Sequence, residues 1–130
     1  MVSWDQEEQS LIVDPRFGEA VRLFNAGEWY DCHDRFEELW HETQGQSRRA
    51  LQGILQIAVA HHHLNRGNQH GATVLMGEGL GRLQPFGTEQ FGLDLVLLRQ
   101  QTMARLQALQ HGDAEACRAL PQPRLQRVHS

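Results

Sequence analysis

The residues best suited to chemistry lie in one stretch, between Glu28 and Asn68. Two of them, His33 and Glu37, are four residues apart, so their side chains can touch if the stretch is helical. His62 comes later, near the end of the next helical segment. Imidazole and carboxylate groups can bind zinc, iron, manganese or nickel, and they can also act as general acid and base. His33, Glu37 and His62 are therefore the candidate metal ligands and the candidate catalytic residues.

The pattern admits a divalent transition metal as cofactor but does not require one. The single His-Glu dipeptide lacks the second histidine of an HExxH motif, and no paired Glu-x-x-His run of the di-iron type is present. The interpretation we favour is structural: buried His33 and His62 would hydrogen-bond to each other, to Glu37 or to Gln56. A metal-free pocket for a small molecule of unknown identity, or for catalysis, is the third interpretation.

Four more side chains are candidates for ligand binding. Arg49 could hold an anion near the first turn of a helix, although an ion pair with Glu37 or Glu38 is the interpretation we favour. Trp29, Tyr30 and Trp40 could line a pocket, although their helical spacing favours core packing. The four candidates are Arg49, Gln56, His63 and Trp40.

Two helices must position these groups. The hydrophobic pattern predicts a helix over residues 28–43, with His33 and Glu37 where its apolar face meets its polar face. A turn ending at Ser47, a plausible N-cap, leads into a second helix that ends near Arg66. This second helix is apolar on two faces, which predicts a central place in a bundle.

The rest of the chain is also predicted to be helical, without any strand. The helix over residues 69–83 contains four glycines, each costing about 1 kcal/mol relative to alanine, so we expect it to be the softest. The fold class is therefore all-α: a single compact domain over residues 1–130, with about five helices around a central apolar third helix. An N-terminal arm (1–13) and an extended C-terminal tail (121–130) flank the bundle. The remaining predicted helices are 15–26, 94–111 and the short segment 114–120.

The composition argues against several classes of partner. With a net charge of −4 and no basic face, neither nucleic acid nor an anionic membrane is expected as a partner. All twelve basic residues are arginine, so no Schiff-base or P-loop lysine exists. No apolar run approaches the ~20 residues that cross a bilayer.

The expected compartment is the cytoplasm. The first ten residues are polar and acidic, unlike a signal peptide. Cys32 and Cys117 lie far apart and outside any CxxC motif, so neither a disulfide framework nor a zinc knuckle is expected. Cys32 is interpreted as a small buried hydrophobic residue.

The stretch Phe24–Ala72 carries an ordered set of motifs. A glycine precedes an aromatic pair, a His-x-x-x-Glu-x-x-Trp run and an Arg-x-x-x-Gly helix follow, and a histidine stands before a Gly-Asn turn. In this order the stretch closely resembles the small all-helical proteins catalogued as domain of unknown function 309. The resemblance implies a compact helical bundle and no particular activity. The matching residues are Gly27, Trp29, Tyr30, His33, Glu37, Trp40, Arg49, Gly53, His62, Gly67 and Asn68.

Three functions stay open on the sequence. The favoured one is a cytoplasmic binding or interaction module whose histidine–glutamate cluster is structural. The second is a small metal-dependent or acid/base enzyme, hydrolase-like, that uses His33, Glu37 and His62, so whether the protein is an enzyme is left open. The third is a homo-oligomer that pairs through residual apolar surface.

Overall fold

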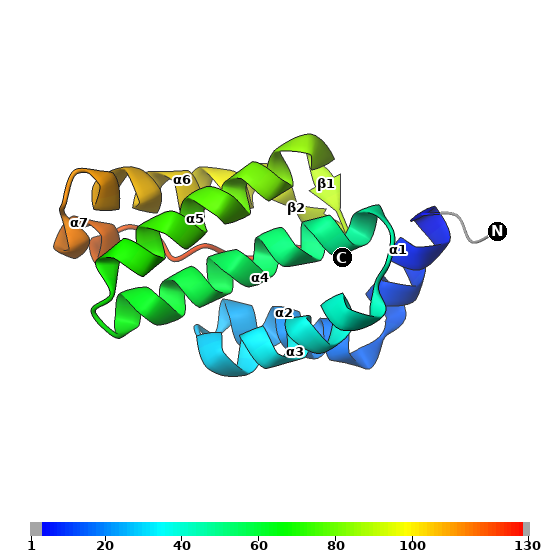
Figure 1. The fold of residues 1–130 in the computed structure, drawn as a ribbon. Coiled ribbons are helices and arrows are strands. Elements are labelled where there is room, and N and C mark those ends of the chain that lie inside the picture. Colours follow the sequence, from blue (N-terminus) through cyan, green and yellow to red (C-terminus); the bar gives the residue numbers. More distant parts are fainter. Residues whose placement is uncertain (1–3, 129–130) are drawn as a thin grey trace.

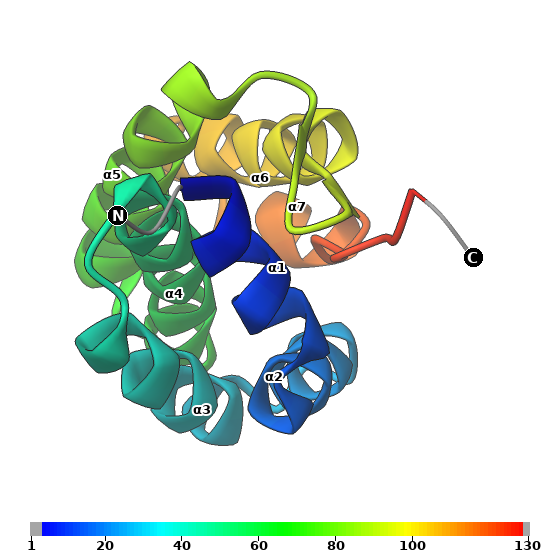
Figure 2. The ribbon, with the colours of Figure 1, turned by 90° about the vertical axis from the view of Figure 1, so that its right-hand side faces the viewer.

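Helix α4 (Gln46–Asn65) is the longest element and joins the two halves of the molecule. In the computed structural model, which describes residues 4–128, α2 and α3 lie on one side of α4 and α5 and α6 lie on the other (Figure 1). Viewed along the bundle, consecutive helices follow one another round a ring (Figure 2). The other elements are α1 (Trp4–Val13), α2 (Pro15–Asn25), α3 (Trp29–Glu42), α5 (Gln69–Leu83), the 3-10 turn η1 (Gln84–Phe86), β1 (Glu89–Gln90), β2 (Leu93–Asp94), α6 (Leu95–Gln110) and α7 (Ala114–Ala119).

The predicted all-α class is confirmed, and the five predicted long helices correspond to α2 through α6. Helix α4 has the central place expected of it, because 11 of its 20 residues are buried between its neighbours. The prediction of no strand was wrong in a small way, since β1 and β2 pair as a two-residue antiparallel hairpin. Among the described residues, no helix is both long enough and apolar enough to cross a membrane.

Helices α4 and α5 approach closely because two glycines meet at their contact. A Cβ on Gly79 would lie only 2.8 Å from the carbonyl oxygen of Gly53 and 2.9 Å from Cγ1 of Ile57. Real Cβ atoms essentially never come this close to other heavy atoms. Only glycine therefore fits at Gly79 without a shift of the backbone of α4, which explains one of the four glycines in α5.

Residues 4–13, expected to be part of an arm, form helix α1, which lies across one end of the ring (Figure 2). Both carboxylate oxygens of Glu7 accept from the backbone N–H of Gly45, at 3.0 and 3.3 Å, and one also accepts from that of Gln44. Gly45 is the N-cap of α4, so Glu7 places a negative charge at the positive end of the helix dipole. The prediction of Ser47 as the N-cap was wrong, because this residue lies inside the helix and is buried.

The segment after α7 returns along the bundle in an extended course. Leu125 is 2% exposed and belongs to the same hydrophobic core as α2 and α3. Its backbone N–H donates to Oδ1 of Asn25, and its carbonyl accepts from Nδ2 of the same side chain. Arg127 then pairs with Leu93 of β2 as an isolated bridge. The C-terminal segment is therefore packed against the bundle through residue 127.

Candidate functional site

Two pockets follow one another along the face that α3 and α4 share. The first, here called the tyrosine pocket, has a volume of about 120 Å³, and the second, the tryptophan pocket, about 280 Å³. The tyrosine pocket is lined by Trp29, Tyr30, His33, Val59 and His62. The tryptophan pocket is lined by Glu37, Trp40, Gln52, Leu55 and Gln56. Each pocket thus draws side chains from both helices of the hairpin.

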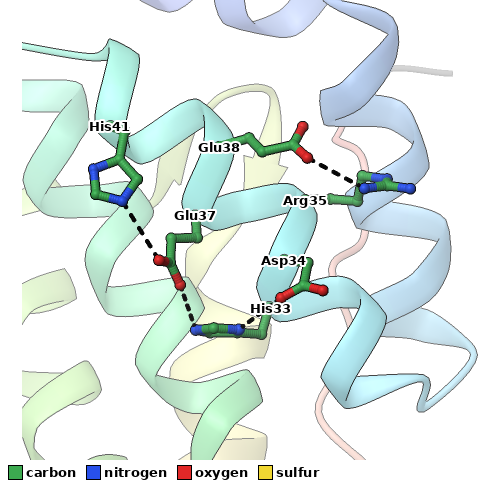
Figure 3. Close-up of polar contacts among 6 residues, drawn as sticks. All are labelled: His33, Asp34, Arg35, Glu37, Glu38 and His41. Atoms are coloured by element: carbon green, nitrogen blue, oxygen red, sulfur yellow. Dashed lines mark hydrogen bonds and ion pairs between the residues drawn. The ribbon is translucent and has the colours of Figure 1, made fainter.

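His33 and Glu37 connect the two pockets, one turn apart on α3 (Figure 3). Nε2 of His33 lies 2.7 Å from Oε2 of Glu37, so the contact predicted from their spacing is present. Nδ1 of His33 lies 3.3 Å from Oδ1 of Asp34, and Nε2 of His41 lies 3.4 Å from Oε1 of Glu37. Both ring nitrogens of His33 therefore face carboxylate oxygens.

The expected burial of His33 was wrong. Its side chain is 29% exposed and that of Glu37 is 41% exposed. The reason is geometric: the boundary between the apolar and polar faces of α3 lies at the edge of its contact with α4, where solvent reaches. His33 and Glu37 are thus accessible to a ligand.

His62 lies in the tyrosine pocket with His33, as the grouping of candidates predicted, but it is only half-buried. Its ring stands 5.7 Å from the ring of Tyr30, centroid to centroid. Tyr30 was expected in the core and is instead 63% exposed. The adjacent His61 is fully buried instead, and its ring lies 4.8 Å from that of Trp29. His61 therefore supplies the interior stack and His62 faces the pocket.

Trp40 lines the tryptophan pocket and is partly buried. The guanidinium carbon of Arg48 lies 4.0 Å from the centre of a Trp40 ring, a cation–π contact that the sequence analysis missed. The Nε1 donor of Trp40 is buried and has no hydrogen-bond partner among the described residues. Buried polar atoms are usually paired, so the unpaired donor sets Trp40 apart from the other described side chains of the two pockets.

The other candidate ligand-binding residues have different surroundings. Gln56 lines the tryptophan pocket, but its amide donates to Glu78 and accepts from Arg82, which ties α4 to α5. His63 lies 3.2 Å from Asn68 in the turn after α4. Arg49 is exposed, and the predicted ion pair with Glu37 or Glu38 is wrong.

The two glutamates of α3 have closer partners than Arg49. Glu37 contacts His33 and His41, and Glu38 pairs with Arg35 at 3.3 Å (Figure 3). Both glutamates therefore pair with neighbours on α3 and not with Arg49 across the hairpin.

Within the part of the chain that the structure describes, no three histidine, cysteine or acidic groups are arranged to hold a metal ion. His33, Glu37 and His62 share the pocket region without forming a three-ligand cluster. Cys32 is fully buried, as predicted, and its thiol contacts the carbonyl oxygen of Ala20. Burial raises the pKa of this thiol well above its usual range, so Cys32 is not a nucleophile for the neighbouring pocket.

Three residues of the two pockets were not predicted: Gln52, Leu55 and Val59. They lie three and four residues apart on α4 and continue to His62, which is the spacing of a single helix edge. This spacing is visible in the sequence. It could have identified the three residues, because the sequence already predicts that their helix pairs with the helix that carries His33.

Residues 17–75 match the model of the family described as "Domain of unknown function (DUF309)". The predicted resemblance is confirmed. The chain is also 37% identical over 77 residues to the "Uncharacterized protein YpuF" of Bacillus subtilis (strain 168). That match covers 57% of this chain and 44% of the relative, so it spans less than half of the relative's length. The DUF309 segment contains all of α3 and α4, and with them both pockets.

Proposed function

We propose that this protein is a binding module whose ligand occupies the tyrosine and tryptophan pockets. The observation that carries the proposal is the position of the accessible His33–Glu37 contact between two pockets on one helical hairpin. Aromatic walls with a few convergent polar groups are the usual composition of a small-molecule site. The polar groups here are few: one imidazole, one carboxylate and two glutamine amides line the pockets together with His62.

A larger hollow, of about 610 Å³, lies between α5 and α6 and is a competing site. It is mainly apolar, with Leu80, Met103 and Leu106 among its walls. None of its lining residues carries a buried polar atom without a partner, within the described part of the chain. It also lies wholly outside the DUF309 segment, which ends at residue 75. Both arguments favour the pockets on α3 and α4.

The proposed partner is a small molecule rather than nucleic acid. The net charge is −4, and the neighbouring surface of α3 carries Asp34, Glu37 and Glu38 against Arg35. This charge repels a phosphate backbone. The cytoplasm is the proposed compartment, because Cys32 and Cys117 are free thiols and such thiols persist in reducing surroundings.

The test is a nuclear magnetic resonance titration of the full ¹⁵N-labelled chain with small neutral, cationic and anionic aromatic compounds. We expect binders to shift the indole N–H signal of Trp40 and the backbone signals of Tyr30 and Val59. The Trp40 signal is assigned by its loss in Trp40→Phe. Shifts confined to Gly77, Met103 and their neighbours would place binding between α5 and α6 and overturn the proposal.

A matched pair of variants sharpens this test. Tyr30 and Met103 are both large exposed side chains at the edge of a pocket, with exposed fractions of 63% and 42%. Tyr30→Ala should weaken binding by roughly three- to tenfold, because it removes one aromatic wall. Met103→Ala should leave the affinity unchanged. The opposite ranking would contradict the proposed site.

A second candidate function, an acid/base hydrolase, is favoured by one distance, the 2.7 Å between His33 and Glu37. A carboxylate beside an imidazole can orient it as a base. Asp34 lies at the other ring nitrogen, however, and its contact would have to break first. The hydrolysis of p-nitrophenyl acetate distinguishes the two functions: the enzyme requires His33→Gln to be much slower than the exposed His41→Gln. The binding module predicts equal rates for both variants.

A further inference from the structure

We infer that the ligand of these pockets is an organic cation: an ammonium or guanidinium group carried on a flat apolar group. The inference rests on the proposed function, because it names the chemical class of ligand for the same pockets. Three features of the described residues support it, namely the aromatic walls, the spare capacity of one carboxylate, and the sign of the surrounding charge.

The first feature is the wall of the tyrosine pocket. Trp29 is 5% exposed and held in place by the edge of the Phe24 ring at 5.0 Å and by His61 at 4.8 Å. Tyr30 and His62 line the same pocket, with their ring centroids 5.7 Å apart. A pocket of about 120 Å³ lined by such rings suits a single flat ring or a short alkyl chain, and aromatic faces attract a nearby cation.

The second feature is the carboxylate of Glu37. Its Oε2 is close to His33, whereas Oε1 has only a 3.4 Å contact with the exposed His41. A carboxylate can accept at about four lone-pair positions, so Glu37 keeps room for an added donor. A ring in the tyrosine pocket would carry its charged group toward Glu37, one helical turn further along α3.

The third feature is the balance of charge around the pockets. No arginine lines either pocket and the chain has no lysine, although Arg48 stacks on Trp40 and Arg82 donates to Gln56 beside the tryptophan pocket. The adjoining surface carries Asp34, Glu37 and Glu38, and its one arginine, Arg35, is paired with Glu38. A charged His33 would still be outnumbered by the two carboxylates it contacts. An anionic ligand would find no guanidinium in the tyrosine pocket, while a cation finds the carboxylates of Asp34 and Glu37 beside His33.

The test uses three ligands of similar shape and different charge: benzylammonium, benzyl alcohol and benzoate. Each is titrated into the full-length protein at constant ionic strength, and dissociation constants are taken from the shifts of Tyr30 and Val59. We expect benzylammonium to bind about tenfold more tightly than benzyl alcohol, and benzoate to bind most weakly.

Two acidic residues of α3 provide matched variants. Glu37→Gln should bring benzylammonium down to the affinity of benzyl alcohol, about a tenfold loss, and leave benzyl alcohol unaffected. Glu38→Gln removes the same charge from the same helix, outside both pockets, and should change neither affinity more than about twofold. Tyr30→Ala should weaken benzylammonium and benzyl alcohol alike. Circular dichroism and the thermal midpoint show whether each variant is folded.

The outcomes separate the inference from the function on which it rests. If the charged and neutral ligands bind equally at Tyr30 and Val59, the inference of a cationic ligand is overturned, while the proposed binding module is not. A loss with Glu38→Gln as large as that with Glu37→Gln overturns the role of Glu37 in holding the charged group, because a diffuse acidic surface would then hold the cation. Absence of any shift at these pockets with all three ligands overturns the proposed function itself.

Discussion

His61 differs from the histidine next to it in its surroundings. It is 1% exposed, its Nδ1 lies 2.8 Å from the carbonyl oxygen of Ile57, and its Nε2 has no partner among the described residues. Burial, aided by the charge of Arg105 on α6, lowers the pKa of His61 from 6.5 to about 4. His61 is therefore a neutral interior side chain at neutral pH, while His62 on the next residue faces a pocket.

This lowered pKa predicts a loss of stability in acid. The unfolded chain takes up the His61 proton at a higher pH than the folded chain, so the free energy of unfolding falls as the pH drops from about 6.5 toward about 4. The loss should be on the order of 3 kcal/mol. Denaturant unfolding of wild type and His61→Phe, at pH 7 and pH 4.5, measures it. We expect a much smaller pH effect in the variant, and equal pH effects would contradict the assignment.

Sequence could identify the His33–Glu37 contact but could not tell His61 from His62. The contact follows from a four-residue spacing on one helix, which is a local property. The two adjacent histidines point about 100° apart on a helix that is apolar on both faces. Which face meets α3 and which meets the interior depends on packing between distant segments. The sequence pattern therefore favours His62 for the core, where the structure has His61.

At the scale of elements, α5 shows how one helix can contain glycines with opposite effects. Gly79→Ala should destabilise the protein by about 1–3 kcal/mol, because the added Cβ meets the backbone of α4. Gly81 has no atom of a neighbouring segment within 4 Å of the same position. Gly81→Ala should therefore stabilise the protein by about 0.5–1 kcal/mol through helix propensity. Chemical denaturation of both variants measures the difference.

Equal effects of the two substitutions would contradict the close packing of α4 and α5 at Gly79. The sequence predicted the bounds of α5 correctly, because the spacing of its apolar residues is a local signal. On the sequence alone every glycine of α5 is expected to lower stability, because the distance from a glycine to α4 cannot be predicted from neighbouring residues. For the same reason the sequence predicted no helix at residues 4–13, where Glu7 and Glu8 bind backbone groups 37 and 83 residues away.

At the scale of the whole molecule, the extended segment after α7 closes the ring of helices. Asn25 of α2 attaches this segment to the first half of the chain, because its side chain forms hydrogen bonds with both backbone groups of Leu125, at 2.8 and 2.9 Å. Asn25→Ala should cost about 1–3 kcal/mol, because both groups lose their partner in a half-buried place. Asn65→Ala, at the exposed end of α4, should change stability by less than about 0.5 kcal/mol.

Thermal unfolding of these two asparagine variants checks the closure of the ring. Similar midpoints for both would show that the C-terminal segment contributes little. The sequence predicted this segment as an extended tail, since Pro121 and Pro123 do not favour a helix. It could not predict the burial of Leu125, because that depends on contacts across a hundred residues of chain.

The same arrangement bears on function at the scale of the whole molecule. The DUF309 segment carries the hairpin and both pockets, while α6, α7 and the C-terminal segment complete the core behind them. Under the proposed function, α3 and α4 therefore bind the ligand and the second half of the chain supports them.

The most direct test of the binding site is a set of intermolecular nuclear Overhauser contacts to the ring protons of bound benzylammonium. We predict contacts to the ring of Tyr30 and the methyl groups of Val59, which line the tyrosine pocket. Contacts instead to the methyl groups of Leu80 and Met103, between α5 and α6, would contradict it.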